Sequence, residues 1–382
     1  SPDGSGVTNN ALATVNARKG DISQNRLATR FFGIFNPVKG FTLEGSFNLE
    51  QTGSIKEQQP VFLDRWSFRT DEVIVAGTGR TYVLNRNDRT YRRYMDGIAR
   101  YQNTFAGALN FHVMAGISQE YYKSAWFEAQ KYDLTDPSLT VLNAATVDAD
   151  ASGTASDWGM HSYFGRMSVD WKEKYLLEGN LRYDGSSRFR AGDTRWGMFP
   201  SLSAGWRISE ESFMTDITWL DNLKLRASYG ALGNNSIGNY DYQALYSSSN
   251  YVLNGTLQTG FAQTAIANAI ITWESTYVTN LGIDFGLLRN RLSGSLELFD
   301  KDTRNILINL PAPNVRGTAS LPQQNAARVR NKGVELALNW SDRIGGVRYQ
   351  VGGNMSFINN KVTRFKGDEK TISGENQLQE GL

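Results

Sequence analysis

Hydrophobic and polar residues alternate strictly in several segments of the chain, which is the period of a β-strand and not of a helix. Between Tyr175 and Asp184 the odd positions are Tyr, Leu, Gly, Leu and Tyr, whereas the even positions are Leu, Glu, Asn, Arg and Asp. The same division recurs in residues 41–50, 223–229, 334–340 and 347–357. Helical periodicity is scarce, and only residues 209–220 predict a short helical turn. The chain is therefore predicted to be all-β.

The predicted strands are long, at about 9 to 14 residues, and strands of about 9 to 11 residues are what a tilted membrane-spanning strand needs. Their connections differ at the two ends of the sheet. The tight connections are residues 36–39, 171–174, 288–291 and 341–346, and the long ones are residues 122–157, 184–196, 233–254 and 303–327. This asymmetry is typical of a transmembrane antiparallel up-and-down β-barrel, of which we expect about fourteen strands here.

The polarity of the two faces of each predicted strand indicates what each face contacts. In a membrane barrel the apolar face contacts lipid and the polar face lines the lumen, so Leu177, Leu225 and Leu336 are expected to contact hydrocarbon. Aromatic residues near the tight turns (Phe35, Trp171 and Trp340) fit an interfacial girdle. A large soluble sandwich also alternates, but charged residues in the middle of long strands favour the barrel.

Composition removes several other classes of protein. The chain has 382 residues with 40 basic and 38 acidic side chains, and this net charge of +2 removes the main argument for nucleic-acid binding, which requires a basic face. It has no cysteine, which excludes disulfides and thiol catalysis. The two histidines stand alone, and the calcium-like opening at Asp148 lacks its closing carboxylate because Gly159 occupies that position. Nucleotide-binding and nucleophile motifs are also missing, so neither an enzyme nor a cofactor or metal site is expected.

Three segments carry a family resemblance. Residues 175–189 (YLLEGNLRYDGSSRF), 195–210 (RWGMFPSLSAGWRISE) and 223–234 (LKLRASYGALGN) resemble the SusC/RagA family of TonB-dependent outer-membrane transporters. Shorter matches follow at residues 163–167, 237–240, 280–286 and 329–336. They keep the order of the family and cover roughly residues 101–363.

The resemblance implies an outer-membrane barrel of a Gram-negative bacterium with about 22 strands and an N-terminal plug. It also implies a SusD-like surface lipoprotein as a lid, energy from a TonB complex, and a dimer of transporter–lid pairs. Residues 1–382 are expected to be a portion of that barrel domain, without plug or signal peptide. The implied function is import of a large nutrient, oligosaccharide first and peptide second. A structural or adhesive surface barrel, or a soluble carbohydrate-binding or hydrolytic domain, remains as an alternative.

Seven residues are candidates for substrate binding. They are Glu178, Arg182, Asp184, Arg188, Trp196, Arg226 and Tyr240. The loop from Asp184 to Phe189 is expected at the cell exterior, where it contacts substrate or lid, or forms a turn in which Arg188 pairs with Asp184. The strand charges either bind substrate or form a polar lining together with Arg207, Lys224, Asp284, Glu297 and Glu335. Loop aromatics such as Tyr240 either stack on sugar rings or pack the loops together.

Overall fold

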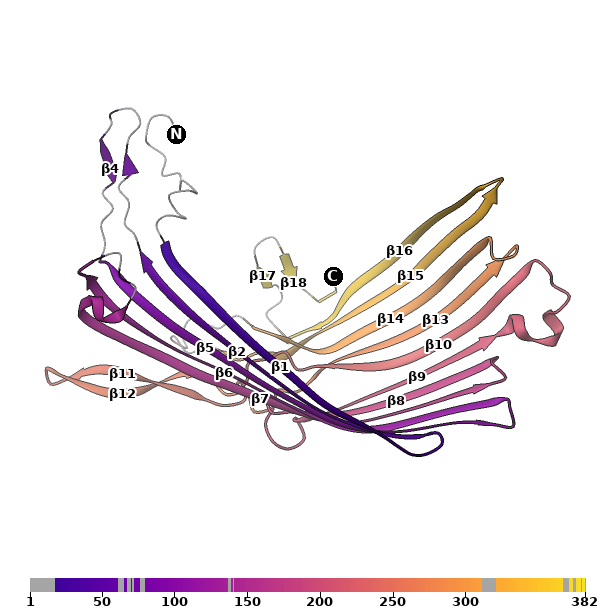
Figure 1. The fold of residues 1–382 in the computed structure, drawn as a ribbon, viewed down its shortest axis with the longest axis horizontal. Helices are drawn as coiled ribbons and strands as arrows, with labels where there is room; N and C mark the ends of the chain where they lie inside the picture. Colours follow the sequence, from indigo (N-terminus) through magenta and orange to yellow (C-terminus); the bar gives the residue numbers. More distant parts are fainter. Residues whose placement is uncertain are drawn as a thin grey trace. The chain divides into compact units, whose positions relative to one another are not determined.

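Long antiparallel strands account for most of the chain (Figure 1). The computed structural model describes residues 18–60, 65–66, 70, 72–75, 80–136, 139, 141–310, 321–366, 371–373, 376–378 and 380–381. Twelve strands form one sheet in the order β1-β2-β5-β6-β7-β8-β9-β10-β13-β14-β15-β16. With the separate hairpin of β11 and β12 the long strands number fourteen, which agrees with the expected number, although the sequence analysis placed β11 in a connection.

The strands of the large sheet are β1 (Arg18–Val38), β2 (Phe41–Pro60), β5 (Tyr82–Phe105), β6 (Leu109–Leu134), β7 (Ala145–Trp171), β8 (Tyr175–Ser186), β9 (Trp196–Arg207), β10 (Leu220–Asn234), β13 (Glu274–Leu287), β14 (Leu292–Ile308), β15 (Gln324–Ile344) and β16 (Val347–Phe365). Three small hairpins accompany it: β3 (Arg65–Trp66) with β4 (Val73–Val75), β11 (Leu245–Leu253) with β12 (Thr256–Ala265), and β17 (Thr371–Ser373) with β18 (Asn376–Leu378). Contacts divide the chain into two compact units, residues 1–31, 47–94 and 120–157, and residues 32–46, 95–119 and 158–382.

Strand length is where the sequence prediction was wrong. Strands β6 and β7 have 26 and 27 residues, and they occupy most of the predicted long connection at residues 122–157. The reason is that alternation marks only the part of a strand with one apolar and one polar face. Where neither face carries a run of large apolar residues, as from Lys123 or Asp148 onward, the strand continues without that signal.

Two further connections contain structure that the sequence analysis missed. The predicted connection at residues 233–254 includes β11 and leads into β12 through Asn254 and Gly255, both with positive φ (50° and 76°). Asn-Gly is the sequence preferred by a tight hairpin turn. The predicted helical turn at residues 209–220 is reduced to two 3-10 turns, η2 (Ile208–Glu210) and η3 (Ser212–Met214). A third 3-10 turn, η1 (Leu142–Ala144), precedes β7. Within the described ranges, no helix is long and apolar enough to cross a membrane.

One face of the sheet between β7 and β16 is apolar and open. Leu177 and Leu281 are 48% and 54% exposed, and Leu225 is also exposed at 37%. Leu336 belongs to the same face, because it is paired with Leu296 on the neighbouring strand. These leucines therefore do not lie in a two-layer core, which is the arrangement that a soluble sandwich requires. We call this surface the apolar face and the opposite one the polar face.

Aromatic side chains border the apolar face on β7, β8 and β9. At the tight-turn end, Tyr175 stacks between Trp171 and Trp206, with ring centroids 5.3 and 6.2 Å away. At the other end, Tyr183 stacks on Trp196 at 4.7 Å. On a strand tilted by about 40°, Tyr175 and Tyr183 are separated by roughly 20 Å along the barrel axis, close to the height of an outer-membrane apolar band.

The border of the apolar face at the end opposite the tight turns, here called the upper border, runs diagonally across the strands. Cross-strand pairing connects Gly179, Leu202, Tyr229, Thr279 and Asp300 into one row. On β14 this row already carries a charge, whereas on β8 the apolar face continues past it to Tyr183. Over four strand spacings, a tilt of about 40° predicts a shift of roughly four to five residues. The four residues from Gly179 to Tyr183 on β8 match this shift.

Candidate functional site

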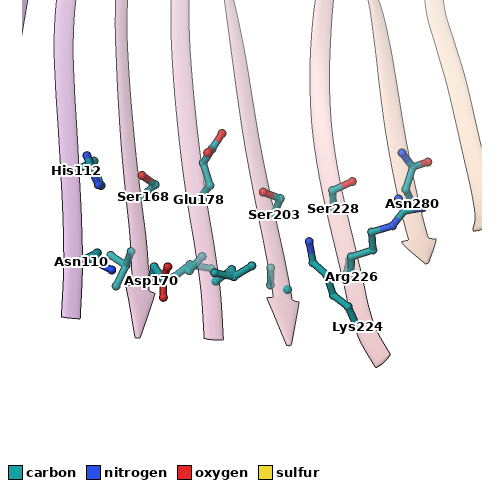
Figure 2. Close-up of a pocket in the computed structure, with 16 residues that line it drawn as sticks. Asn110, His112, Ser168, Asp170, Glu178, Ser203, Lys224, Arg226, Ser228 and Asn280 are labelled. Carbon is teal, nitrogen blue, oxygen red and sulfur yellow. The ribbon is translucent and has the colours of Figure 1, made fainter. Parts of the chain in front are cut away.

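The polar face holds a cavity of about 590 Å³ near the tight-turn end of β6 to β13. Figure 2 shows its polar lining, which comes from six neighbouring strands: Asn110, His112, Ser168, Asp170, Glu178, Ser203, Lys224, Arg226, Ser228 and Asn280. The alternation of each strand brings these side chains to one face, and the antiparallel register aligns them. The cavity is therefore a direct product of the pattern seen in the sequence.

A row of small hydrogen-bonding groups crosses this cavity. The register pairs Ser168 with Glu178, Glu178 with Ser203, Ser203 with Ser228, and Ser228 with Asn280. The side-chain carbonyl oxygen of Asn280 is buried and accepts no hydrogen bond from the described residues. Three hydroxyls, a carboxylate and an amide thus face the cavity along one line, and each can donate to or accept from a polar cargo.

Arg226 organises the charges beside this row. Its Nε donates to Oδ1 of Asp284 at 3.2 Å, and its Nη2 donates to Oε2 of Glu297 at 2.7 Å. Glu297 is two strands away from Arg226, and the side chain reaches it by crossing Gly282 on the strand between. Arg226 therefore pairs with two carboxylates, and its positive charge is largely compensated within the lining.

The other charged strand candidates are paired in the same way. Glu178 accepts hydrogen bonds from Arg166 at 2.5 Å and from Asn180 at 3.0 Å. Arg182 pairs with Asp184 at 2.9 Å, and Asp184 itself is buried. The structure thus brings Glu178 and Arg226 into one cavity and places Arg182 with Asp184 further along the same strand. A role in binding cargo stays a prediction for all four.

Arg188 lies in the β8–β9 loop and joins it to the loop that follows β10. Its Nε donates to Oδ1 of Asn239 and its Nη1 donates to the carbonyl oxygen of Asn235, both at 3.0 Å. Its guanidinium also lies 5.0 Å from the ring centroid of Trp158. Burial lowers the pKa of Arg188. The alternative in which Arg188 pairs with Asp184 is wrong, because Asp184 pairs with Arg182.

We call Arg188 with its partners Asn235 and Asn239 the clasp. A small apolar core lies directly beneath it. It consists of Phe189, Phe199, Ala231, Ile237, Ile271 and Trp273. Phe189 and Ile271 are fully buried, and the indole nitrogen of Trp273 donates to the carbonyl oxygen of Arg195 at 2.9 Å. The segment from Asp184 to Phe189 is therefore an ordered anchor between loops, and it is more than a simple strand reversal.

The remaining two candidates lie elsewhere. Trp196 is on the apolar face, because it stacks on Tyr183 and Tyr163. Tyr240 lines a separate pocket of about 230 Å³ between loops, which also involves Asp241 and Gln323. The seven candidates thus occupy five places in the structure, and whether Trp196 or Tyr240 contacts substrate is untested.

Sequence analysis missed the neutral members of the cavity, namely Asn110, Ser168, Ser203, Ser228 and Asn280. Each lies at a polar position of the alternation, so the signal was present, but register between strands was needed to show that they align. In the described part of the chain, no group of three or more His, Asp or Glu side chains is arranged to hold a metal ion.

Comparison with known proteins identifies the family. A model of the family described as "TonB dependent receptor-like, beta-barrel" matches residues 2–380. The chain is 30% identical to TonB-dependent receptor P39 of Formosa agariphila over 82% of this chain and 30% of that protein. It is 28% identical to TonB-dependent receptor SusC of Bacteroides thetaiotaomicron over 81% of this chain and 30% of that protein.

A solved structure shows the same fold. The RagAB peptide transporter superposes with a TM-score of 0.84 at 21% identity, covering 97% of this chain and 40% of the transporter chain. This chain therefore spans about 30% of the length of the sequence relatives and 40% of that structure. The resemblance to SusC and RagA seen in the sequence is confirmed, and the chain belongs to the TonB-dependent receptor-like β-barrel family.

Proposed function

We propose that residues 1–382 form a portion of the barrel of an active importer in the outer membrane of a Gram-negative bacterium. The observation that carries this proposal is the inverted sheet. Its apolar face is exposed over several strands, and its polar face carries an open cavity with polar side chains in its lining. A bilayer selects this arrangement, because the lipid-facing side must be apolar and the lumen polar.

The partners follow from the family. The importer works with a plug domain, with a TonB complex that supplies energy, and with a SusD-like surface lipoprotein that closes the extracellular end. Two such transporter–lid pairs form a dimer. The clasp at Arg188 supports the lid contact, because it holds two long loops in a fixed arrangement on the side where a lid has to close.

The cavity favours oligosaccharide as the cargo. Its central row presents the hydroxyls of Ser168, Ser203 and Ser228 and the amide of Asn280, and these groups match the hydroxyls of a neutral sugar. The nearby charges of Glu178 and Arg226 are already compensated by their own partners. A charged peptide would compete with those ion pairs. Peptide is nevertheless the second candidate, because the RagAB transporter of similar fold carries peptides.

Uptake experiments test this proposal. A strain that lacks the full-length gene is complemented with wild type or with Ser203→Leu/Ser228→Leu, and accumulation of labelled oligosaccharides and peptides is measured with and without TonB. We expect TonB-dependent oligosaccharide uptake that the double variant reduces roughly tenfold. Control variants with leucine at Ser341 and Ser356, outside this cavity, should be normal. Uptake that neither the deletion nor the loss of TonB affects would refute import and leave a structural or adhesive surface barrel.

A further inference from the structure

A band of basic side chains lies on the apolar face, directly above its upper border on β14, β15 and β16. The basic members are Arg304, Arg328, Arg330, Lys332 and Lys361, and Asp300 and Asp302 lie among them. We call these seven residues the cationic patch. It has five positive and two negative side chains, an excess of three positive charges.

Register shows that the patch continues the apolar face. On β14, Leu296 and Leu298 are followed two and four residues later by Asp300 and Asp302. Pairing places Val334 opposite Leu298, and Lys332 opposite Asp300. On β16, Phe357 is opposite Val334, and Lys361 is opposite Arg330. The surface thus changes from apolar to charged and polar within one residue pair, and the basic residues Arg330 and Lys361 follow in the next row.

The two aspartates hold the arginines in place. Arg330 donates from Nε and Nη2 to Asp300 at 2.8 and 2.5 Å. Arg328 donates in the same fork to Asp302 at 2.7 and 2.5 Å, and Arg304 donates to Asp302 at 2.7 Å. A guanidinium has five N–H donors, so each arginine keeps donors for another ligand while its rotamer is fixed.

The patch remains accessible after these pairs form. The side chains of Arg330 and Lys332 are 43% and 60% exposed. Lys332 is 3.6 Å from Asp300, which Arg330 already contacts more closely. Arg304 lies 4.6 Å from the ring centroid of Tyr277, an aromatic residue at the border of the apolar face. The basic groups are thus ordered, exposed and adjacent to the apolar face.

We infer that the cationic patch binds phosphate groups of outer-leaflet lipid. This inference rests on the proposed function, which puts the apolar face in the bilayer and the long loops outside. A side chain at the border of a lipid-facing surface meets lipid headgroups, and the phosphate of such a headgroup accepts hydrogen bonds from forked guanidinium donors. The acyl chains of the same lipid then lie along Leu298, Val334 and Phe357. One lipid molecule is thus bound both through its headgroup phosphate and through its acyl chains.

Lipid retention by the full-length protein tests this inference. Wild type and variants are purified from outer membranes and placed in phosphatidylcholine nanodiscs that contain lipid A, either phosphorylated or with its phosphates removed. Bound lipid is counted by native mass spectrometry. We expect wild type to retain phosphorylated lipid A at least tenfold better than the phosphate-free form.

Substitutions on the two opposite faces of the sheet distinguish binding by the cationic patch from a nonspecific effect of net charge. Lys332→Gln leaves the Asp–Arg pairs intact, and it should weaken retention roughly fivefold. Lys301→Gln removes one charge from the polar face of β14, and retention should be unchanged. Adding Arg330→Gln and Lys361→Gln to Lys332→Gln should weaken retention roughly 100-fold. Heat-modifiable migration shows whether each variant is folded.

Three results would overturn the inference: equal retention by wild type and Lys332→Gln, equal retention of phosphorylated and phosphate-free lipid A, or displacement of the lipid by an equal concentration of inorganic phosphate. These outcomes differ from failure of the proposed function. If the protein does not fractionate with the outer membrane, the proposed function is refuted before lipid is measured. If it is a correctly located importer without lipid preference, only the lipid inference is refuted.

Discussion

Arg226 crosses directly over Gly282 to reach a carboxylate two strands away. A Cβ atom at Gly282 would lie 2.6 Å from Cζ of Arg226, closer than side-chain carbons approach one another. The glycine therefore makes room for the ion pair with Glu297, and the missing side chain is part of the polar lining.

Gly282→Ala is expected to move Arg226 away from Glu297 and leave that carboxylate opposite Glu335, with which the register pairs it. Loss of the pair and the resulting like-charge contact should lower the free energy of unfolding by about 1 kcal/mol. Urea unfolding of the full-length protein in detergent measures this value. Gly353→Ala is the matched control, because no atom lies within 4 Å of the added carbon. Equal stability of both variants would contradict the assigned role of Gly282.

Arg188→Ala should loosen two loops together. The substitution removes the hydrogen bonds that Arg188 donates to the carbonyl oxygen of Asn235 and to Oδ1 of Asn239. We expect faster hydrogen exchange and faster protease cleavage in residues 187–195 and 235–241, with normal insertion into the membrane. Arg190→Ala serves as the control, since Arg190 is exposed in the same loop. Release of only one of the two loops would show that Arg188 does not connect them.

Glu211 should make stability depend on pH at the tight-turn end. Its carboxylate accepts hydrogen bonds from the Tyr175 hydroxyl, from the Trp206 indole at 3.1 Å and from Lys174 at 3.3 Å. These donors, Tyr175 foremost, lower the pKa of Glu211. A carboxylate with a lowered pKa stabilises the fold above its unfolded value of about 4.3, and this contribution is lost as pH falls through the folded value.

The expected result is that Glu211→Gln destabilises the protein clearly at pH 7 and much less at pH 3. Unfolding midpoints at pH 7, 5 and 3 measure the difference. Glu210→Gln is the control, because it removes the neighbouring charge, which is exposed and pairs with Arg207 at 3.0 Å. A constant difference between wild type and Glu211→Gln at all three values would rule out titration of this group.

The medium at the apolar face can be tested with one charge. Leu296→Arg places a cation among Ile283, Leu298 and Leu336 on the apolar face, and it should cost about 2 to 4 kcal/mol if this surface lies in the bilayer. Ser295→Arg puts the same charge on the polar face, next to Asp284, and it should cost less than about 1 kcal/mol. The two variants are compared by equilibrium unfolding in lipid vesicles. Equal costs would mean that the apolar face does not contact hydrocarbon.

Much of this architecture can be predicted from the sequence, because alternation depends on local residues. The turn at residues 172–174 and the apolar face of β8 follow directly from the segment around Leu177. The extensions of β6 and β7 could not be predicted, since neither face there carries a run of large apolar residues. The β11–β12 hairpin is a different case. Asn254-Gly255 is a recognisable turn signal, but the strands on either side contain no charged residues, so their alternation is weak.

The site is less predictable than the fold. Glu178 and Arg226 are charges at polar positions of strands, and these were found. The alignment of Ser168, Ser203 and Ser228 depends on register across four strands, which no single segment contains. Arg188 was recognised as a loop residue, but its partners are about 50 positions away in the sequence. Long-range pairing is the information that a local pattern does not hold.

The diagonal border of the apolar face, from Tyr183 on β8 to Asp300 on β14, restricts how this segment can change its length during evolution. Adding one residue below the border of a strand would exchange its two faces, and adding two would pull a basic or acidic group down among acyl tails. Insertions and deletions should therefore accumulate above the border, in the strand extensions and exterior loops. The part of the molecule above the border is free to vary because the part below it is fixed in register.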